Sequence, residues 1–331
     1  MKKSIIQKKL FDQIQKVKPA HLSLVDAVAD ALRISNDSVY RRIRGDMMID
    51  IEETVKLCSH FQISMDSLAD IDPNKSYIRC RYTPLNLENM KDYMTFVQVA
   101  SDLFENTRLA LEGEIIMSAV DVPIFLILPY RELTAFKLFS WSKSTYGYTA
   151  DFDAFVKEGW VDNQTLENIH EKIKRNYQLI PSTEIWTTST TDTILRLLIY
   201  HSEMKHFSDK KTPLLLCEQL LDLMNTLQKW AENGTKGPKE TPFKFYISET
   251  DIANTFILFK NAESSSCLVK LYTINGLGIS DENFCREAKQ WLHNTARRST
   301  LVSGASEKER RKFFTAQQKK IRLLMESIES N

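Results

Sequence analysis

Short helical segments with capping residues follow one another through the first 68 residues, and this pattern restricts the fold more than any other feature. The first segment, Ser4 to Val17, has apolar residues at helical spacing, and Pro19 ends it. The residues expected to face inward are Ile6, Leu10, Ile14 and Val17.

A second and a third helix are predicted with only a short turn between them. Ser23 is the expected N-cap of the second, because a serine hydroxyl at this position accepts a hydrogen bond from a free amide of the first turn. The turn begins at Arg33, Ser35 or Asn36 caps the third helix, and Gly45 ends it. The predicted buried residues are Leu24, Val28 and Leu32, with Ala29 on a neighbouring face, and Val39 and Ile43 of the third helix.

Two more helices complete a predicted five-helix bundle, one from about Ile51 to Phe61 and a short one around Met65 to Leu68. Residues 1–45 contain ten Lys and Arg against four Asp and Glu, whereas residues 46–72 contain one Lys against seven acids. The net charge of the whole chain is only +1, so attraction to a polyanion has to come from local charge. A basic segment followed by an acidic one suits a module with one face on phosphate.

The third helix carries the residues that we expect to contact DNA. Short polar side chains at the start of a helix reach base edges in the major groove, and Tyr40 and Arg41 follow one turn along the same face. Asn36 can pair with adenine, Arg41 with guanine or phosphate, and Tyr40 with a thymine methyl or a backbone oxygen. The predicted contacts are Ser35, Asn36, Asp37, Ser38, Tyr40 and Arg41, with Arg42 and Arg44 on phosphate and Lys18 and Ser23 on the flanking strand.

The unit from Ser4 to Asp72 resembles the helix-turn-helix of phage repressor and Cro-type proteins. Arg33 stands where that family usually has glycine, and Arg42 where many members have an apolar residue. The resemblance implies a transcription regulator that binds double-stranded DNA, with a two-fold homodimer as the default. It rests on Ala29, Ile34, Val39, Ile43, Gly45 and the segment Ile51 to Leu68.

Beyond this unit the sequence predicts a basic linker over residues 73–86 and a larger region of mixed structure. Residues 87–235 are expected to be mostly helical and residues 239–331 to be α+β, and the two can form one domain. The helix predicted over 87–112 is either a core helix or a dimer contact. Strands are predicted at 114–120, 123–128, 244–248, 255–260 and 268–274, and further helices at about 130–142, 149–158, 163–178, 190–206, 212–233, 281–298 and 307–327.

The predicted fold class is therefore mainly α with smaller β elements, an N-terminal helix-turn-helix bundle followed by a larger α+β region. The whole chain also resembles, more loosely, regulators of Bacteroidetes-type bacteria with an uncharacterised C-terminal region, on the stretches Tyr177–Trp186 and Ser303–Phe314. In a one-component regulator, the C-terminal region senses a small-molecule or protein effector or forms the dimer. Its aromatic residues either line such a pocket or fill a core: Trp141, Tyr146, Tyr148, Trp160, Trp186, Tyr200 and Phe207.

A second hypothesis stays open, in which the protein is an interaction factor without specific DNA binding. The N-terminal bundle and a basic C-terminal helix would then bind a protein partner. Residues 297–322 hold nine Lys and Arg against two Glu. This stretch predicts either an amphipathic helix with a solvated basic face or a contact with DNA, an acidic partner or a second subunit.

The sequence holds no catalytic motif: G-x-S-x-G, P-loop, G-x-G-x-x-G and H-E-x-x-H are all missing. His201 and His206 stand five apart, which is expected to separate them around a helix and to preclude a shared metal. We therefore expect no enzyme activity, no cofactor and no metal. Five cysteines without C-x-x-C spacing predict reduced thiols in a cytoplasmic protein. The polar N-terminus and the short apolar runs predict no signal peptide and no membrane partner.

Overall fold

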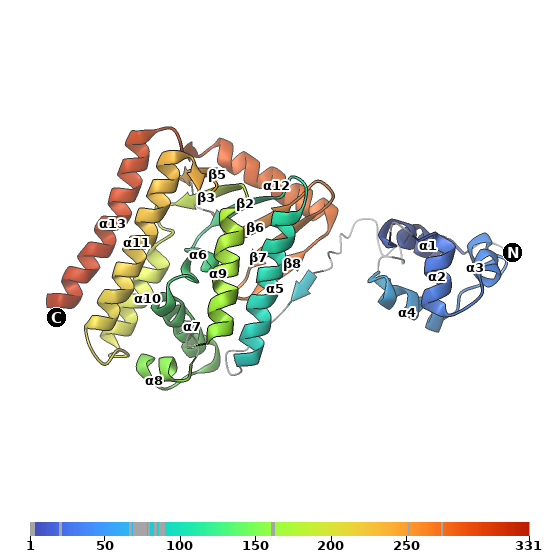
Figure 1. Cartoon of the computed structure of the whole chain (residues 1–331), viewed down its shortest axis with the longest axis horizontal. Coiled ribbons are helices and arrows are strands. Elements are labelled where there is room, and N and C mark those ends of the chain that lie inside the picture. The colour runs from blue at the N-terminus through green and yellow to red at the C-terminus, as the bar shows by residue number, and fades with distance from the viewer. Residues whose placement is uncertain are drawn as a thin grey trace. The chain divides into compact units, whose positions relative to one another are not determined.

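The computed structural model describes residues 4–19, 22–65, 68, 78, 80–82, 85, 90–159, 163–250, 252–272 and 274–330. The chain divides into two compact units, Met1–Arg79 and Cys80–Asn331, whose elements are labelled in Figure 1. It is mainly helical, with a mixed β-sheet in the second unit. No helix within the described ranges is long and apolar enough to cross a membrane.

The described part of the N-terminal unit contains four helices: α1 (Ile5–Val17), α2 (Leu24–Leu32), α3 (Asn36–Arg44) and α4 (Ile51–His60). Each begins at a side chain that accepts a hydrogen bond from the amide three residues further on, which confirms the predicted caps of α2 and α3. These capping residues are Ser4, Ser23, Ser35 and Asp50.

The buried face of α1 differs from the prediction. Ile6 and Val17 are 53% and 54% exposed, and the residues that face inward are Gln7, Leu10, Phe11 and Ile14. Their i, i+3, i+4, i+7 spacing follows one helix face, and the spacing of the predicted set fits a helix face equally well. A polar residue holds a buried position because the Gln7 side chain bonds three backbone groups, one in the last turn of α3 and two in the segment after it.

The buried face of α2 also differs slightly from the predicted one. Val28 is buried as expected, and Val25, Ala27 and Ala29 join it, whereas Leu24 and Leu32 are only partly buried. The predicted fifth helix around Met65 to Leu68 lies partly outside the described residues. Within them, the Leu68 amide donates to the Met65 carbonyl and the Leu68 side chain is buried in this core.

The C-terminal unit is built on a nine-stranded sheet of order β1-β8-β7-β6-β2-β3-β5-β4, with β9 paired to β5. Strands β2, β3 and β5 are mutually parallel, and the other pairings are antiparallel. The strands are β1 (Cys80–Tyr82), β2 (Glu114–Ala119), β3 (Ser182–Thr187), β4 (Thr235–Lys236), β5 (Thr241–Ser248), β6 (Phe256–Lys260), β7 (Ser265–Lys270), β8 (Gly276–Ile279) and β9 (Thr300–Leu301).

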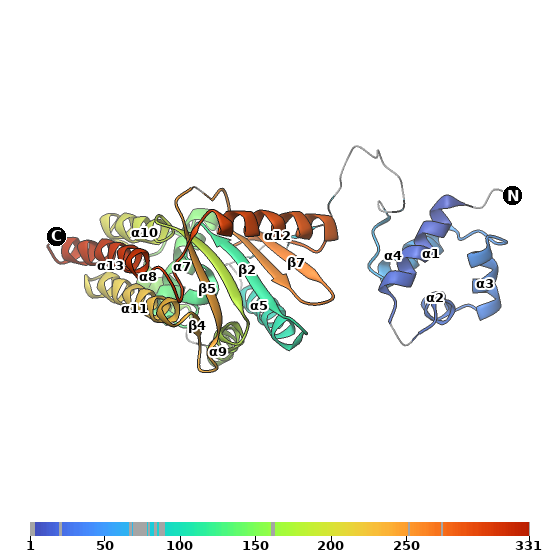
Figure 2. The ribbon, with the colours of Figure 1, turned by 90° about the horizontal axis from the view of Figure 1, so that it is seen from above.

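Helices cover both faces of this sheet, because successive residues of each central strand point to opposite sides. On β2, Ile115 and Met117 join the larger core, whereas Ile116 packs with residues of α12 on the other face. Figure 2 shows α12 on one side of the sheet and α5 and α9 on the other. The helices are α5 (Met90–Leu109), α6 (Ile124–Ile127), α7 (Arg131–Tyr146), α8 (Phe152–Lys157), α9 (Gln164–Gln178), α10 (Asp192–Glu203), α11 (Lys211–Asn233), α12 (Glu282–Arg297) and α13 (Glu307–Ser330).

Several sequence predictions for this unit are wrong. The run 123–128 forms the helical turn α6 rather than a strand, because short runs that are apolar on every side do not distinguish the two structures. Cys80–Tyr82, placed in the linker, pairs with β8, and Leu85 is buried in the core. Strands β3 and β8 were not predicted. The two ranges 87–235 and 239–331 contribute neighbouring strands to one sheet, so they form a single unit.

Candidate nucleic-acid interface

A side-chain cap holds one end of α3, and a left-handed glycine ends the other. Ser35 Oγ accepts from the Ser38 amide at 3.4 Å and lies 3.0 Å from Ser38 Oγ. At the other end, Gly45 has φ of 82°, a left-handed conformation that glycine adopts without steric cost. The turn before α3 also needs a left-handed residue, and Arg33 adopts it with φ of 58°. Arginine thus fills a position that suits glycine, as the sequence indicated.

One face of α3 is buried and the other is open. Val39 is fully buried and Ile43 partly buried in the N-terminal core, as predicted. Tyr40, the next residue along the helix, is 53% exposed. The exposed residues of the predicted DNA-contact set are Ser23, Ser35, Asn36, Asp37, Tyr40, Arg41 and Arg44, whereas Lys18, Ser38 and Arg42 are half-buried.

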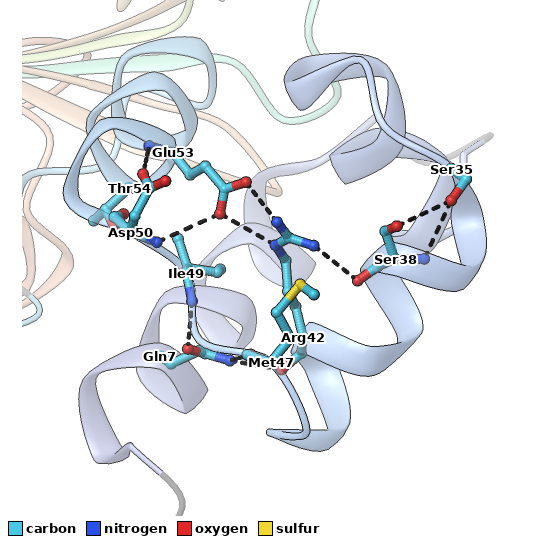
Figure 3. A network of polar contacts seen from close by, with 9 residues as sticks. All are labelled: Gln7, Ser35, Ser38, Arg42, Met47, Ile49, Asp50, Glu53 and Thr54. Atoms are coloured by element: carbon cyan, nitrogen blue, oxygen red, sulfur yellow. Dashed lines mark hydrogen bonds and ion pairs between the residues drawn. The ribbon is translucent and has the colours of Figure 1, made fainter.

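Arg42 does not point into solvent, a placement that does not favour its predicted role in gripping phosphate (Figure 3). Its Nη2 and Nε donate to the two carboxylate oxygens of Glu53 at 2.6 and 3.1 Å. The two side chains are only 11% and 18% exposed. Nη1 donates to the Ser38 carbonyl at 3.2 Å. A guanidinium held by a bidentate carboxylate is committed to that partner, so Arg42 joins α3 to α4.

A network around Gln7 and Glu53 fixes the segment between α3 and α4. Gln7 Nε2 donates to the carbonyls of Arg42 and Met47 at 2.7 and 2.9 Å, and its Oε1 accepts from the Ile49 amide at 3.0 Å (Figure 3). Glu53 also closes a capping box with Asp50. This network was not predicted, although a glutamine on the inward face of a helix was a usable signal.

Asp26 on α2 links two of the predicted contact residues. Its carboxylate accepts from Ser23 Oγ at 2.6 Å and from Asn36 Nδ2 at 3.1 Å. The hydrogen bonds from Ser23 and then Asn36 lower the pKa of this carboxyl. Asn36 is thereby oriented across the turn, and one amide hydrogen and its carbonyl oxygen stay available.

The remaining cations of the set differ in how strongly they are held. Lys18 Nζ donates to the Leu22 carbonyl at 2.7 Å, so it ties down the segment before α2. Arg44 forms an exposed ion pair with Asp46 at 3.1 Å, which solvent weakens. Among the described residues, the side chains of Tyr40 and Arg41 make no hydrogen bond or ion pair. Tyr40 and Arg41 are therefore side chains of the open face that are uncommitted, in the sense that no group of the described residues holds them by a hydrogen bond or an ion pair.

The histidines of the C-terminal unit come together, contrary to the prediction. Helix α10 ends at Glu203, and Lys205, with φ of 53°, turns the chain back. His201 Nδ1 and His206 Nδ1 are 2.8 Å apart, and His201 Nε2 lies 3.2 Å from Ser140 Oγ. The described residues nevertheless contain no group of three or more His, Cys, Asp or Glu placed to hold a metal ion.

All five cysteines are free thiols, with only Cys80 exposed.

Comparisons of the chain with protein-family models, with curated proteins and with solved structures find no match.

Proposed function

We propose that this protein is a sequence-specific DNA-binding transcription regulator, in which α2, the turn at Arg33 and α3 act as a helix-turn-helix. The single observation that carries the proposal is the open face of α3: it is capped at both ends, buried through Val39, and presents uncommitted Tyr40 and Arg41 side chains. A helix with short polar residues at its start, and with a tyrosine and an arginine free to bind one turn later, fits the major groove.

In this account, Arg41 contacts guanine or phosphate and Tyr40 a thymine methyl or a backbone oxygen, while Asn36 uses its remaining amide hydrogen and carbonyl oxygen on adenine. Asp37 would repel phosphate but can accept from the amino group of cytosine. Arg42 holds α3 against α4 through Glu53 and does not touch DNA. The C-terminal unit would serve as the effector-binding or dimer-forming part.

Selection of random duplex DNA on the full-length protein tests the proposal. The informative variant is Tyr40→Ala/Arg41→Ala. A matched control is Arg196→Ala/Tyr200→Ala on α10, whose tyrosine is 52% exposed, close to the value for Tyr40. We expect an enriched motif that the first variant loses and the control keeps, and a palindromic motif would indicate a homodimer.

No enrichment from folded protein, or a motif that survives in Tyr40→Ala/Arg41→Ala, would contradict the proposal. The alternative, a protein-binding bundle, predicts a shallow dependence of partner affinity on salt. Phosphate contacts predict a steep one, because counterions are released from the duplex.

A further inference from the structure

A small pocket lies just beyond the C-terminal end of β2, a central strand of the sheet. Its walls come from the segment after β2, from the beginnings of β6 and β8, from the end of β7 and from α7. The pocket has a volume of about 60 Å³, which corresponds to roughly four to six water-sized groups. This space is too small for a nucleotide and suits a small organic molecule.

The charged groups at this pocket carry an excess positive charge. Asp121 Oδ2 accepts from Lys137 Nζ at 2.9 Å and from Lys270 Nζ at 3.1 Å. Asp121 and Lys137 are almost completely buried, and the Lys270 side chain is 27% exposed. With both lysines protonated, one carboxylate and two ammonium groups sum to +1; burial lowers the pKa of Lys137, and the neighbouring Asp121 carboxylate opposes this shift. An unbalanced charge in a largely buried site is costly unless an anion compensates it.

The second oxygen of Asp121 is also unsatisfied. Among the residues that the structure describes, no donor reaches Oδ1, although this atom is buried. Buried acceptors without a donor are rare in folded proteins and commonly mark a bound water or ligand. Burial opposes ionisation of Asp121, but Lys137 and Lys270 together outweigh it and lower the pKa of this carboxyl. The free oxygen is therefore a charged acceptor without a donor in the described part of the chain, on a side chain that lines the pocket.

The rest of the pocket is apolar. Asp121 and Lys270 are its charged lining residues, and its apolar lining residues include Ile124, Trp141, Ile257 and Ile274. Small-molecule sites typically combine apolar walls with a few polar groups that fix orientation. Such a lining selects a ligand with a short alkyl part as well as a charged end.

We propose that this pocket binds a small 2-hydroxycarboxylate. The carboxylate compensates the charge of Lys270, the hydroxyl donates to Asp121 Oδ1, and the alkyl substituent packs against Trp141. A hydroxycarboxylate brings the cluster to neutrality, whereas a zwitterionic 2-amino acid leaves it at +1 and adds a third ammonium group. Use of the pocket as an effector site rests on the proposed DNA-binding function, but binding itself does not.

Isothermal titration calorimetry of the full-length protein with L-lactate, in a buffer free of carboxylates, tests the site. A ligand of about six non-hydrogen atoms is expected to bind with Kd of roughly 0.1–1 mM. Propionate lacks the hydroxyl and is expected to bind at least about tenfold more weakly, because Asp121 Oδ1 then has no donor. L-Alanine is expected to bind more weakly than L-lactate. Absence of L-lactate binding up to about 10 mM, equal affinity for propionate, or tighter binding of L-alanine would overturn the assignment.

The variant Lys270→Met locates the binding. It leaves the Asp121–Lys137 ion pair in place, so the unit is expected to fold, as unchanged circular dichroism would verify. We expect L-lactate affinity to fall at least about tenfold. The matched control is Lys260→Met on the adjacent strand β6, a lysine that is 23% exposed and pairs with Glu114 at 3.5 Å. Unchanged affinity in folded Lys270→Met, or an equal loss in the control, would overturn the proposal.

Because the titration contains no DNA, a failure to bind L-lactate leaves the DNA-binding proposal standing. Conversely, a failure to select DNA does not affect the calorimetric result. The two proposals are thus tested separately.

Discussion

The guanidinium of Arg42 on α3 and the carboxylate of Glu53 on α4 face each other through two hydrogen bonds, of 2.6 and 3.1 Å. The same carboxylate accepts from the Asp50 amide in the capping box of α4. The end of α3 and the start of α4 are therefore held by one acidic side chain.

Glu53→Ala is expected to lower the free energy of unfolding of the N-terminal unit by about 1–3 kcal/mol, because it leaves a half-buried guanidinium without its carboxylate and removes part of a cap. Hydrogen exchange at the amides of α3 and α4 measures this change. Arg44→Ala is the control: it breaks only the exposed pair with Asp46 and is expected to have little effect. Equal effects of the two substitutions would contradict the account.

Arg33→Gly is expected to stabilise the N-terminal unit by about 0.5–1 kcal/mol, because Arg33 holds a left-handed conformation at φ of 58°. Arg33→Ala keeps a β-carbon and is expected to give no such gain. Thermal unfolding of both variants makes the comparison. A gain with alanine equal to that with glycine would show that backbone strain is not the cause.

Lys236→Met is expected to destabilise the C-terminal unit by roughly 3 kcal/mol, because it removes the cation that lies near the buried carboxyl group of Glu184. Lys236 Nζ donates to Ser182 Oγ at 2.6 Å, Ser182 Oγ donates to Glu184 at 3.3 Å, and Lys236 Nζ lies 3.4 Å from the centre of the Tyr177 ring. Burial raises the pKa of Glu184 and lowers the pKa of Lys236 to about 7.

The double variant Glu184→Gln/Lys236→Met is expected to recover at least half of that loss, because no unpaired charge remains. Urea unfolding followed by tryptophan fluorescence gives both values. A double variant less stable than Lys236→Met would rule out charge compensation as the link between the two residues.

Acid is expected to destabilise the C-terminal unit through two buried imidazoles. Burial lowers the pKa of His170 and of His201 to about 4, below the unfolded value of about 6.5. The folded state therefore binds fewer protons between these values, so this stability is present above about pH 6.5 and is lost as the pH falls toward 4. By about pH 5 each imidazole is expected to cost about 2 kcal/mol.

Urea unfolding at about pH 7 and pH 5 measures this loss, and carboxylates that titrate in acid contribute to it as well. The difference between the protein and its His201→Gln variant isolates one imidazole. A loss of stability that is the same in both would contradict the assignment to His201.

The parts of the fold that sequence predicts well are those set by neighbouring residues. Ser23 and Ser35 cap their helices, and Gly45 ends α3, because such caps need only a side chain and an amide a few positions away. Most helices of the C-terminal unit also lie where their periodicity places them, as α11 at Lys211–Asn233 illustrates.

The parts that it does not predict depend on partners far along the chain. Strand β3 contains the buried Glu184, whose partner Lys236 lies in β4, so its alternation does not look like that of a core strand. The Arg42 side chain was expected on phosphate because nothing local shows that Glu53 holds it. Lys270 and Asp121 meet across 149 positions, a separation that no short pattern encodes.

The most direct test of the central claim is the affinity of the protein and of Tyr40→Ala/Arg41→Ala for the duplex enriched by selection, measured by fluorescence anisotropy at about 50 and 200 mM salt. We predict at least a tenfold loss for the variant at both concentrations, a steep fall with salt for the protein, and no loss for Arg196→Ala/Tyr200→Ala. An affinity of Tyr40→Ala/Arg41→Ala equal to that of the unchanged protein would contradict the claim that the open face of α3 reads DNA.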